Sequence, residues 1–103
     1  MDQIGIFYIV YFDWPEKMSS EVVEYAKELH VAVNHANWIE EILAASGGIG
    51  GQQSSVWIFR LANYGQLDQL LRETGDSVHK AYQKFFNEMT NVEDLIREEV
   101  NFL

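Results

Sequence analysis

The sequence predicts an α+β fold, in which four antiparallel strands form one sheet and the helices lie together on one of its faces. Residues 4–12 form a run whose two alternating sets of side chains are both apolar, and residues 55–62 largely repeat that pattern. Between and after these strands, apolar residues recur at three- and four-residue steps, as in amphipathic helices. The 103 residues suffice for one domain, residues 1–103, and are too few for two.

Composition and charge exclude several classes of protein. Hydrophobic residues make up 48% of the chain, which is ordinary for a globular domain with a packed core. The absence of cysteine excludes disulfides, thiolate metal sites and cysteine nucleophiles. The net charge of −9 arises from 16 acidic and 7 basic side chains, so nucleic acids and anionic membranes are not expected partners.

Location is inferred from the beginning of the chain and from its longest apolar run. That run, residues 4–12, is far shorter than the roughly 20 residues of a membrane span. The start, Met1-Asp2-Gln3, is acidic, whereas a secretory signal begins with basic residues. We therefore expect a cytoplasmic protein.

The first strand and the first helix are the clearest elements. Residues 4–12 form the strand, and Pro15 follows its end because proline lacks an N–H donor. Ser19 or Ser20 is expected to cap the helix. The apolar stripe of this helix consists of Val22, Ala26, Leu29, Val33 and Ala36.

The middle of the chain is expected to contain a short helix, an arm and a strand. A break near Asn37 resembles a capping box, which predicts a second helix over residues 38–46. Glycines 47 and 48 end that helix. Residues 49–53 suit an edge strand or a hairpin arm, and residues 55–62 form the second strong strand.

The last part of the chain is expected to contain two helices and a strand. Asn63 caps one helix, and Asp76 or Ser77 begins the next. Residues 90–93 are predicted to cap one more helical turn, and residues 97–103 to form the final strand. Helical spacing also fits a set of apolar residues in this region, namely Val92, Leu95, Ile96 and Val100.

This order of elements is the split βαβ arrangement of ferredoxin-like folds, βαββαβ, with a four-stranded antiparallel sheet. In such a sheet the helices cover one face, and an uncovered second face normally carries polar side chains. Here residues 4–12 and 55–62 are largely apolar on both faces. We therefore expect a second copy to cover the open face in a homodimer with closed symmetry.

The pattern resembles the dimeric α+β barrel superfamily, which includes antibiotic-biosynthesis-type monooxygenases, EthD-like proteins and NIPSNAP-like proteins. The resemblance rests on residues 6–11, 38–70 and 82–86 and departs from the usual pattern over residues 30–37. It implies a ligand cavity between the sheet and the helices. It does not imply a single chemistry, because one fold hosts many activities.

One set of candidate ligand-binding residues lies on the first helical region. His30, Asn34 and Trp38 follow at four-residue steps and would share one helix face if the first helix continued past Asn37, whereas a break there would rotate Trp38 away. Asn34 and Trp38, with Arg60, resemble the Asn, Trp and Arg of cofactor-free quinone-forming monooxygenases of the superfamily, which implies that they hold a phenolic substrate, oxygen and a developing anion. The alternative is a helix cap, a packing residue and an ion pair. His30 and His35 are five residues apart, so no metal site is expected.

A second set of candidates is aromatic and extends over the rest of the chain. Tyr8 and Trp57 lie in the middle of predicted strands, and His79 and Tyr82 lie three residues apart on a predicted helix. A histidine beside a tyrosine can move protons near neutral pH. The alternative is a core aromatic cluster with satisfied polar ends.

The function we predict is that of a homodimeric small-molecule-binding protein without a cofactor. Its apolar pocket would lie between the sheet and the helices and would take an elongated lipid-like carboxylate or an aromatic ligand. The first alternative is a cofactor-independent monooxygenase acting on phenolic or polyketide-like substrates. The second is a structural or interaction module whose barrel is filled by side chains.

Overall fold

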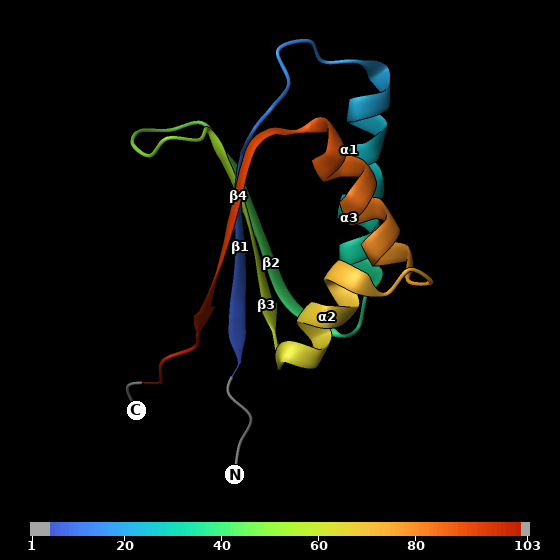
Figure 1. The fold of residues 1–103 in the computed structure, drawn as a ribbon, viewed down its shortest axis with the longest axis vertical. Coiled ribbons are helices and arrows are strands. Elements are labelled where there is room, and N and C mark those ends of the chain that lie inside the picture. The colour runs from blue at the N-terminus through green and yellow to red at the C-terminus, as the bar shows by residue number, and fades with distance from the viewer. Residues whose placement is uncertain (1–4, 102–103) are drawn as a thin grey trace.

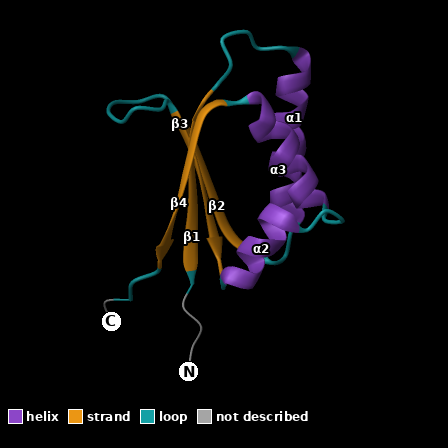
Figure 2. Ribbon diagram, viewed as in Figure 1, coloured by secondary structure: helices purple, strands orange, loops and turns teal. Residues whose placement is uncertain are grey.

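The computed structural model describes residues 5–101, which form one four-stranded antiparallel sheet with three helices on one face (Figure 1; Figure 2). The strands are ordered β2-β3-β1-β4 across the sheet. This is the predicted ferredoxin-like α+β fold, with the second helical region divided in two. The elements are β1 (Ile6–Asp13), α1 (Ser20–His35), β2 (Ile39–Ser46), β3 (Ser55–Leu61), α2 (Tyr64–Arg72), α3 (Ser77–Glu88) and β4 (Thr90–Glu98).

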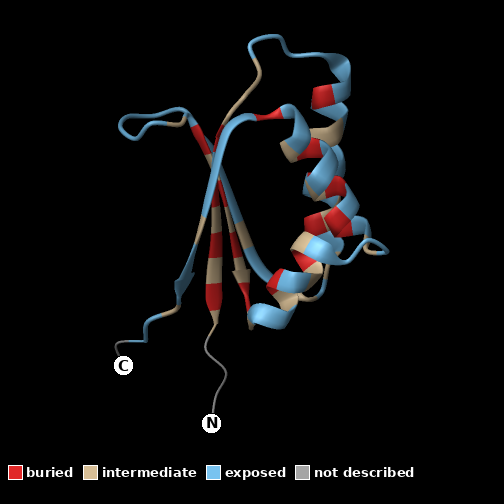
Figure 3. Cartoon of the chain, viewed as in Figure 1, coloured by how far each residue is buried: buried red, intermediate tan, exposed pale blue. Residues whose placement is uncertain are grey.

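The core fills the layer between the sheet and the helices. Alternate side chains of β1 and β3 are buried (Figure 3), and the register places Tyr8 opposite Phe59 and Val10 opposite Trp57. The rings of Phe12 on β1 and Phe85 on α3 meet edge to face at 5.6 Å, which joins sheet to helix. The largest fully buried side chains are Phe12, Phe59, Phe85, Ile6, Leu29, Leu61, Leu70 and Val10.

The helices begin where the sequence places capping side chains. Ser19, Asn63 and Asp76 each accept a hydrogen bond from a first-turn N–H, at 3.2, 3.0 and 2.7 Å respectively. These helix starts confirm the sequence prediction. Within residues 5–101, no helix is both long and apolar enough to cross a membrane. The buried residues of α1 all belong to its predicted stripe: Val22, Leu29 and Val33.

The predicted helix over residues 38–46 is wrong, because residues 39–46 form strand β2 and Trp38 lies in the turn before it. The register between β2 and β3 is irregular directly after Ile39, so Ile39 and Ile42 lie opposite the buried Leu61 and Phe59. Two apolar residues three apart therefore point to the same side of a strand, which gives a helical spacing. Hydrogen bonds to β3 outweigh the weak local preference for helix in this segment.

Residues 47–54, which we call the arm, form the loop between β2 and β3. The N–H of Gly47 donates to the carbonyl of Ser54 at 2.7 Å and closes the loop. Gly47, Gly48, Gly50 and Gly51 all have positive φ, between 79° and 93°, which side chains rarely permit. The predicted hairpin arm is confirmed, whereas the predicted edge strand is wrong. The arm projects from the sheet on the side away from the helices (Figure 1).

The last strand begins earlier than the sequence suggests. The predicted helical turn at residues 90–93 is wrong, because β4 starts at Thr90 and pairs with β1 almost along its whole length. The predicted strand over residues 97–103 overlaps β4 only at positions 97 and 98, and residues 102–103 lie outside the described residues, as does Ile4. β4 is mostly exposed, so it needs few of the apolar residues that identify a strand.

The second face of the sheet, which we call the open face, is covered by none of the described helices (Figure 2). The pairing places Ile9 of β1, Ile58 of β3 and Leu43 of β2 in one row across it. Leu43 is 55% exposed and Tyr11 is 37% exposed. The predicted apolar character of this face is confirmed. By register, its apolar side chains are Phe7, Ile9, Tyr11, Leu43, Ala45, Val56, Ile58 and Leu95.

Candidate functional site

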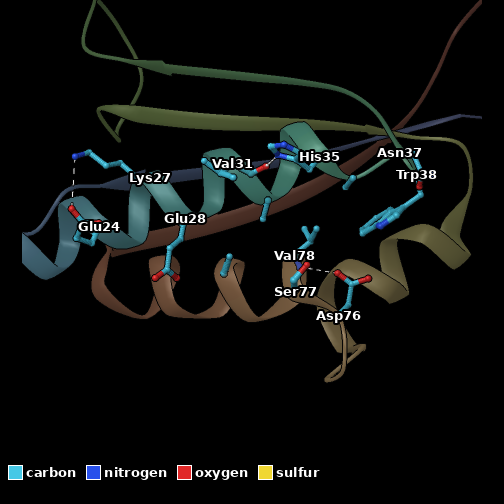
Figure 4. A pocket seen from close by; sticks show the side chains of 13 residues that line it. Glu24, Lys27, Glu28, Val31, His35, Asn37, Trp38, Asp76, Ser77 and Val78 are labelled. Carbon is cyan, nitrogen blue, oxygen red and sulfur yellow. Dashed lines mark hydrogen bonds and ion pairs between the residues drawn. The ribbon is translucent and has the colours of Figure 1, made fainter.

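A groove of about 780 Å³ lies between α1 and α3, and we call it the α1–α3 groove (Figure 4). Small side chains leave this space, since Ala32 of α1 and the C-cap Ala36 line it together with Val78 and Ala81 of α3. No residue of a strand contributes to it. The sequence predicts a pocket between the sheet and the helices. The groove lies instead beside that layer, which core side chains fill. It is lined by Glu24, Lys27, Glu28, Val31, Ala32, His35, Ala36, Asn37, Trp38, Asp76, Ser77, Val78 and Ala81.

Two polar ring groups of the groove are available to a ligand. Nδ1 of His35 lies 2.8 Å from the carbonyl oxygen of Val31 and must carry the proton it donates. In the neutral ring, Nε2 is therefore an acceptor. Trp38 extends from the α1–β2 turn toward the first turn of α3 (Figure 4), and its indole N–H donates no hydrogen bond to a described residue. One end of the groove thus offers one acceptor and one donor beside an aromatic ring.

The rim of the groove is mainly acidic. Glu24, Glu28 and Asp76 carry negative charge, and Lys27 is the one lysine or arginine among the described lining residues. Glu28 also pairs with Lys84 at 3.3 Å across the two helices. The same sign prevails over the whole chain, whose net charge is −9. The field at the groove therefore disfavours anionic ligands.

A buried polar chain lies on the other side of α3, within the aromatic layer. The hydroxyl of Tyr8 donates to Asp94 Oδ2 at 2.6 Å and lies 2.9 Å from the hydroxyl of Tyr82. Because Tyr8 has one hydroxyl proton, Tyr82 must donate to Tyr8. Burial is the main cause that raises the pKa of Tyr8 well above its usual range and the pKa of Tyr82 to about 12. Both phenols are therefore neutral hydrogen-bonding groups at neutral pH.

The structure brings only some of the predicted site residues together. Tyr8 and Tyr82 meet in this polar chain, and Trp38 lines the groove. Trp57 packs in the core on Phe59, with ring centroids 5.9 Å apart. The two predicted strand residues are thus divided, with Tyr8 in the polar chain and Trp57 in the core.

The other predicted residues lie apart from these. His79 is buried, and its Nδ1 donates to the carbonyl of Leu70 on α2 at 2.9 Å. Arg60 lies on the open face and pairs with Glu99 at 2.6 Å. His30 and Asn34 are exposed on α1 and line neither described hollow. Asn34, Trp38 and Arg60 therefore do not surround one space within a subunit.

Sequence reasoning missed several residues of these sites. Asp94 falls between the predicted turn at residues 90–93 and the predicted strand over residues 97–103, so the sequence does not place it beside Tyr8. His35 is interpreted from the sequence as a surface or helix-junction residue, without use of its spacing of four from Val31, which permits the bond to the helix backbone. Alanines 32, 36 and 81 carry no functional group, and only the packing of α1 against α3 shows that they leave a groove.

A second hollow of about 430 Å³ lies where the arm meets the open face, and we call it the arm hollow. Tyr11, Ala45, Val56 and Leu95 form its apolar part, and the rest is formed by the arm together with Ser55, Glu93 and Asp94. These four residues also belong to the open face. The hollow is therefore continuous with the uncovered apolar surface of the sheet.

Comparison by sequence finds no protein-family model and no curated protein that matches the chain. Comparison by structure finds a dimeric ferredoxin-like protein of unknown function from Thermobifida fusca, with a TM-score of 0.73 and 12% identity over 94% of this chain and 92% of that one. Hydroxynitrile lyase from Passiflora edulis has a TM-score of 0.73 and 10% identity, covering 96% and 95% of the two chains.

A Dabb family protein with a ferredoxin-like fold from Mesorhizobium loti has a TM-score of 0.70 and 11% identity over 96% of this chain and all, 100%, of that one. At such identities the likeness shows the fold alone. It agrees with the predicted ferredoxin-like architecture. The resemblance to the monooxygenase, EthD-like and NIPSNAP-like groups stays a prediction.

Proposed function

We propose that this chain works as a homodimer whose subunits meet through their open faces, and that each subunit binds a small aromatic molecule in the α1–α3 groove. The groove carries the binding proposal. Its volume of about 780 Å³ lies within the range of about 300–1,000 Å³ that is usual for small-molecule sites. An apolar floor with a few polar groups at one end is also the usual composition of such sites.

The homodimer is supported by the apolarity and the charge balance of the open face. A single subunit would leave Leu43 and Tyr11 in water. Arg60 and Arg97 share this face with Glu41, Glu93 and Glu99, so its charge is close to balanced although the chain carries −9. Two copies can therefore meet there without strong repulsion. Structures of the same fold from Thermobifida fusca, Bacteroides fragilis and Jannaschia are described as dimeric.

The chemistry of the groove favours a neutral or cationic aromatic ligand over a carboxylate. Val31, Ala32 and Ala81 supply an apolar floor for a flat ring. Trp38 offers a ring face and an N–H donor, and His35 Nε2 offers an acceptor for a hydroxyl or amine. The rim carboxylates of Glu24, Glu28 and Asp76 attract a cation and repel an anion. Of the two ligand types predicted from the sequence, the aromatic one therefore fits better.

Fluorescent naphthylamines test whether the groove binds such a ligand. The neutral probe N-phenyl-1-naphthylamine gains fluorescence in an apolar site and is titrated against the wild-type protein. Val31→Trp fills the groove from an exposed position on α1, and we expect it to raise the Kd of the probe by about tenfold or more. Val23→Trp is the matched control, because Val23 is exposed on the same helix outside the groove.

The same titration tests the preference for charge. 8-Anilino-1-naphthalenesulfonate has the same ring system with an added sulfonate, and the acidic rim should make it the weaker ligand. Absence of binding by the neutral probe, or equal binding by both tryptophan variants, contradicts the groove as the site. Tighter binding of the sulfonate contradicts the proposed ligand charge.

The monooxygenase alternative gains no comparable support. It requires Asn34, Trp38 and Arg60 around one substrate, whereas Arg60 lies on the open face, beyond the sheet from the groove. The similarity to hydroxynitrile lyase is a similarity of fold, and no activity is transferred from it.

A further inference from the structure

We infer that the arm of each subunit crosses to the partner subunit and places Ile49 in the partner's arm hollow. This inference rests on the proposed homodimer and assigns it a specific contact. Ile49 is fully exposed, at 107% of its reference area, in the middle of the arm. The arm projects on the open-face side of the sheet (Figure 1), which is the side where the second copy is proposed to lie. An apolar side chain is therefore presented to the partner.

The base of the arm is fixed to the sheet. Asp13 accepts hydrogen bonds from the N–H of Ser54 at 2.7 Å and from Asn91 Nδ2 at 2.9 Å. Gln53 Nε2 donates to the carbonyl of Asn91 at 3.2 Å. These bonds join the arm to the ends of β1 and β4. Together with the glycines of positive φ, they direct the arm before any partner arrives, which lowers the ordering cost of association.

The arm hollow supplies an apolar receptor for Ile49. Its volume is about 430 Å³, and its apolar part consists of Tyr11, Ala45, Val56 and Leu95, with polar arm residues and the carboxylates of Glu93 and Asp94 at its edge. The subunit's own Ile49 does not fill it, because that side chain contacts solvent. In a two-fold dimer each contact occurs twice, so two arms fill two hollows reciprocally. The arms would then extend the interface beyond the sheet surfaces themselves.

Photo-crosslinking between differently labelled copies tests this contact. Benzoylphenylalanine replaces Ile49, and ¹⁵N-labelled and unlabelled chains are mixed, dissociated and reassembled before irradiation. We expect mixed-label crosslinks to peptides that contain Tyr11, Ala45, Val56 or Leu95. The same photo-residue at Met18, an exposed position in the β1–α1 loop, is the control and should give no mixed-label product at these peptides.

A second variant measures the contribution of the arm to association. Ile49→Asp changes a solvent-exposed loop position, so the fold of the subunit should persist. The variant removes a buried apolar side chain from each of two contacts and places a charge there, so we expect the dimer dissociation constant to rise by about tenfold or more.

The outcomes separate this inference from the homodimer on which it rests. A wild-type dimer that gives only same-label crosslinks, or an Ile49→Asp dimer of unchanged affinity, overturns the arm contact and leaves the homodimer standing. A wild-type protein that stays a folded monomer at micromolar concentration overturns both. Mixed-label crosslinks at the arm hollow together with weakened association support the inference.

Discussion

The hydroxyl of Tyr8, on the central strand β1, donates a hydrogen bond of 2.6 Å to Asp94 on the edge strand β4. Tyr8 is 2% exposed, whereas Asp94 is exposed, so this bond connects the aromatic core with the surface. Tyr82 of α3 extends the connection by donating to Tyr8 at 2.9 Å. A buried hydroxyl without a partner is costly, so the chain Tyr82–Tyr8–Asp94 stabilises the contact between α3 and the sheet.

The polar chain predicts a loss of stability at alkaline pH. An unfolded tyrosine has a pKa near 10.0, whereas burial raises the pKa of Tyr82 to about 12 in the folded protein and raises that of Tyr8 further. Between these values the folded state holds more protons than the unfolded state, so the free energy of unfolding falls as the pH rises above 10. Urea denaturation from pH 9 to pH 11.5 measures this decline.

In Tyr82→Phe the free energy of unfolding should fall less steeply as the pH rises above 10, because one of the two phenols with a raised pKa is removed. The variant should also lose about 1 kcal/mol at neutral pH, the usual worth of a hydrogen bond. Tyr64→Phe is the control, since Tyr64 is exposed and takes no part in the hydrogen-bonded set Tyr82–Tyr8–Asp94. A decline as steep in Tyr82→Phe as in the wild type would show that the raised pKa values do not couple to folding.

His79 is expected to act in folding rather than in chemistry. It is buried, and its ring donates to the carbonyl of Leu70, which joins α3 to α2. His79→Phe should lower the free energy of unfolding by about 1–3 kcal/mol, because it leaves a buried carbonyl unpaired. His30→Gln, at an exposed position on α1, should change it little. Chemical denaturation decides, and equal stability of the two variants would refute the structural role.

Asp13 is expected to make the anchoring of the arm sensitive to acid. Hydrogen bonds from Asn91 and Ser54 hold the pKa of Asp13 below its usual 3.8. The stabilisation is therefore present above the unfolded pKa and is lost as the pH falls through the lowered folded value. Hydrogen exchange should show that the Ser54 N–H loses protection in acid. In Asp13→Asn the Ser54 N–H should be weakly protected in acid and at neutral pH alike. Asp68→Asn, on α2, should behave like the wild type.

The sequence predicts those elements whose apolar spacing is regular, and it fails where the spacing is interrupted. β1 and β3 alternate without irregularity, and the stripe of α1 is buried as expected. In β2, the irregular register after Ile39 brings Ile39 and Ile42 to one side and gives the strand a helical spacing. β4 lies at an exposed edge of the sheet. Its pairing with β1 makes it a strand, whereas its mostly polar residues give no strand pattern in the sequence.

The candidate site was harder to predict than the fold. The prediction of Trp38 at a ligand site rested on a helix that continues past Asn37, whereas Trp38 lies in a turn after α1 ends. The α1–α3 groove depends on alanines, which carry no chemistry that a motif would show. The pairing of Tyr8 with Asp94 joins positions 86 apart in sequence, which only the strand order brings together.

The oligomeric state of the wild type and of one open-face variant tests the homodimer most directly. Ile58 lies in the middle of the open face, between Ile9 and Leu43, and Ile58→Lys places a charge there. In sedimentation equilibrium at micromolar concentration, we expect the wild type at twice the 11.9 kDa of one chain and the variant at 11.9 kDa with its circular dichroism retained. A folded wild-type protein of 11.9 kDa would contradict the homodimer.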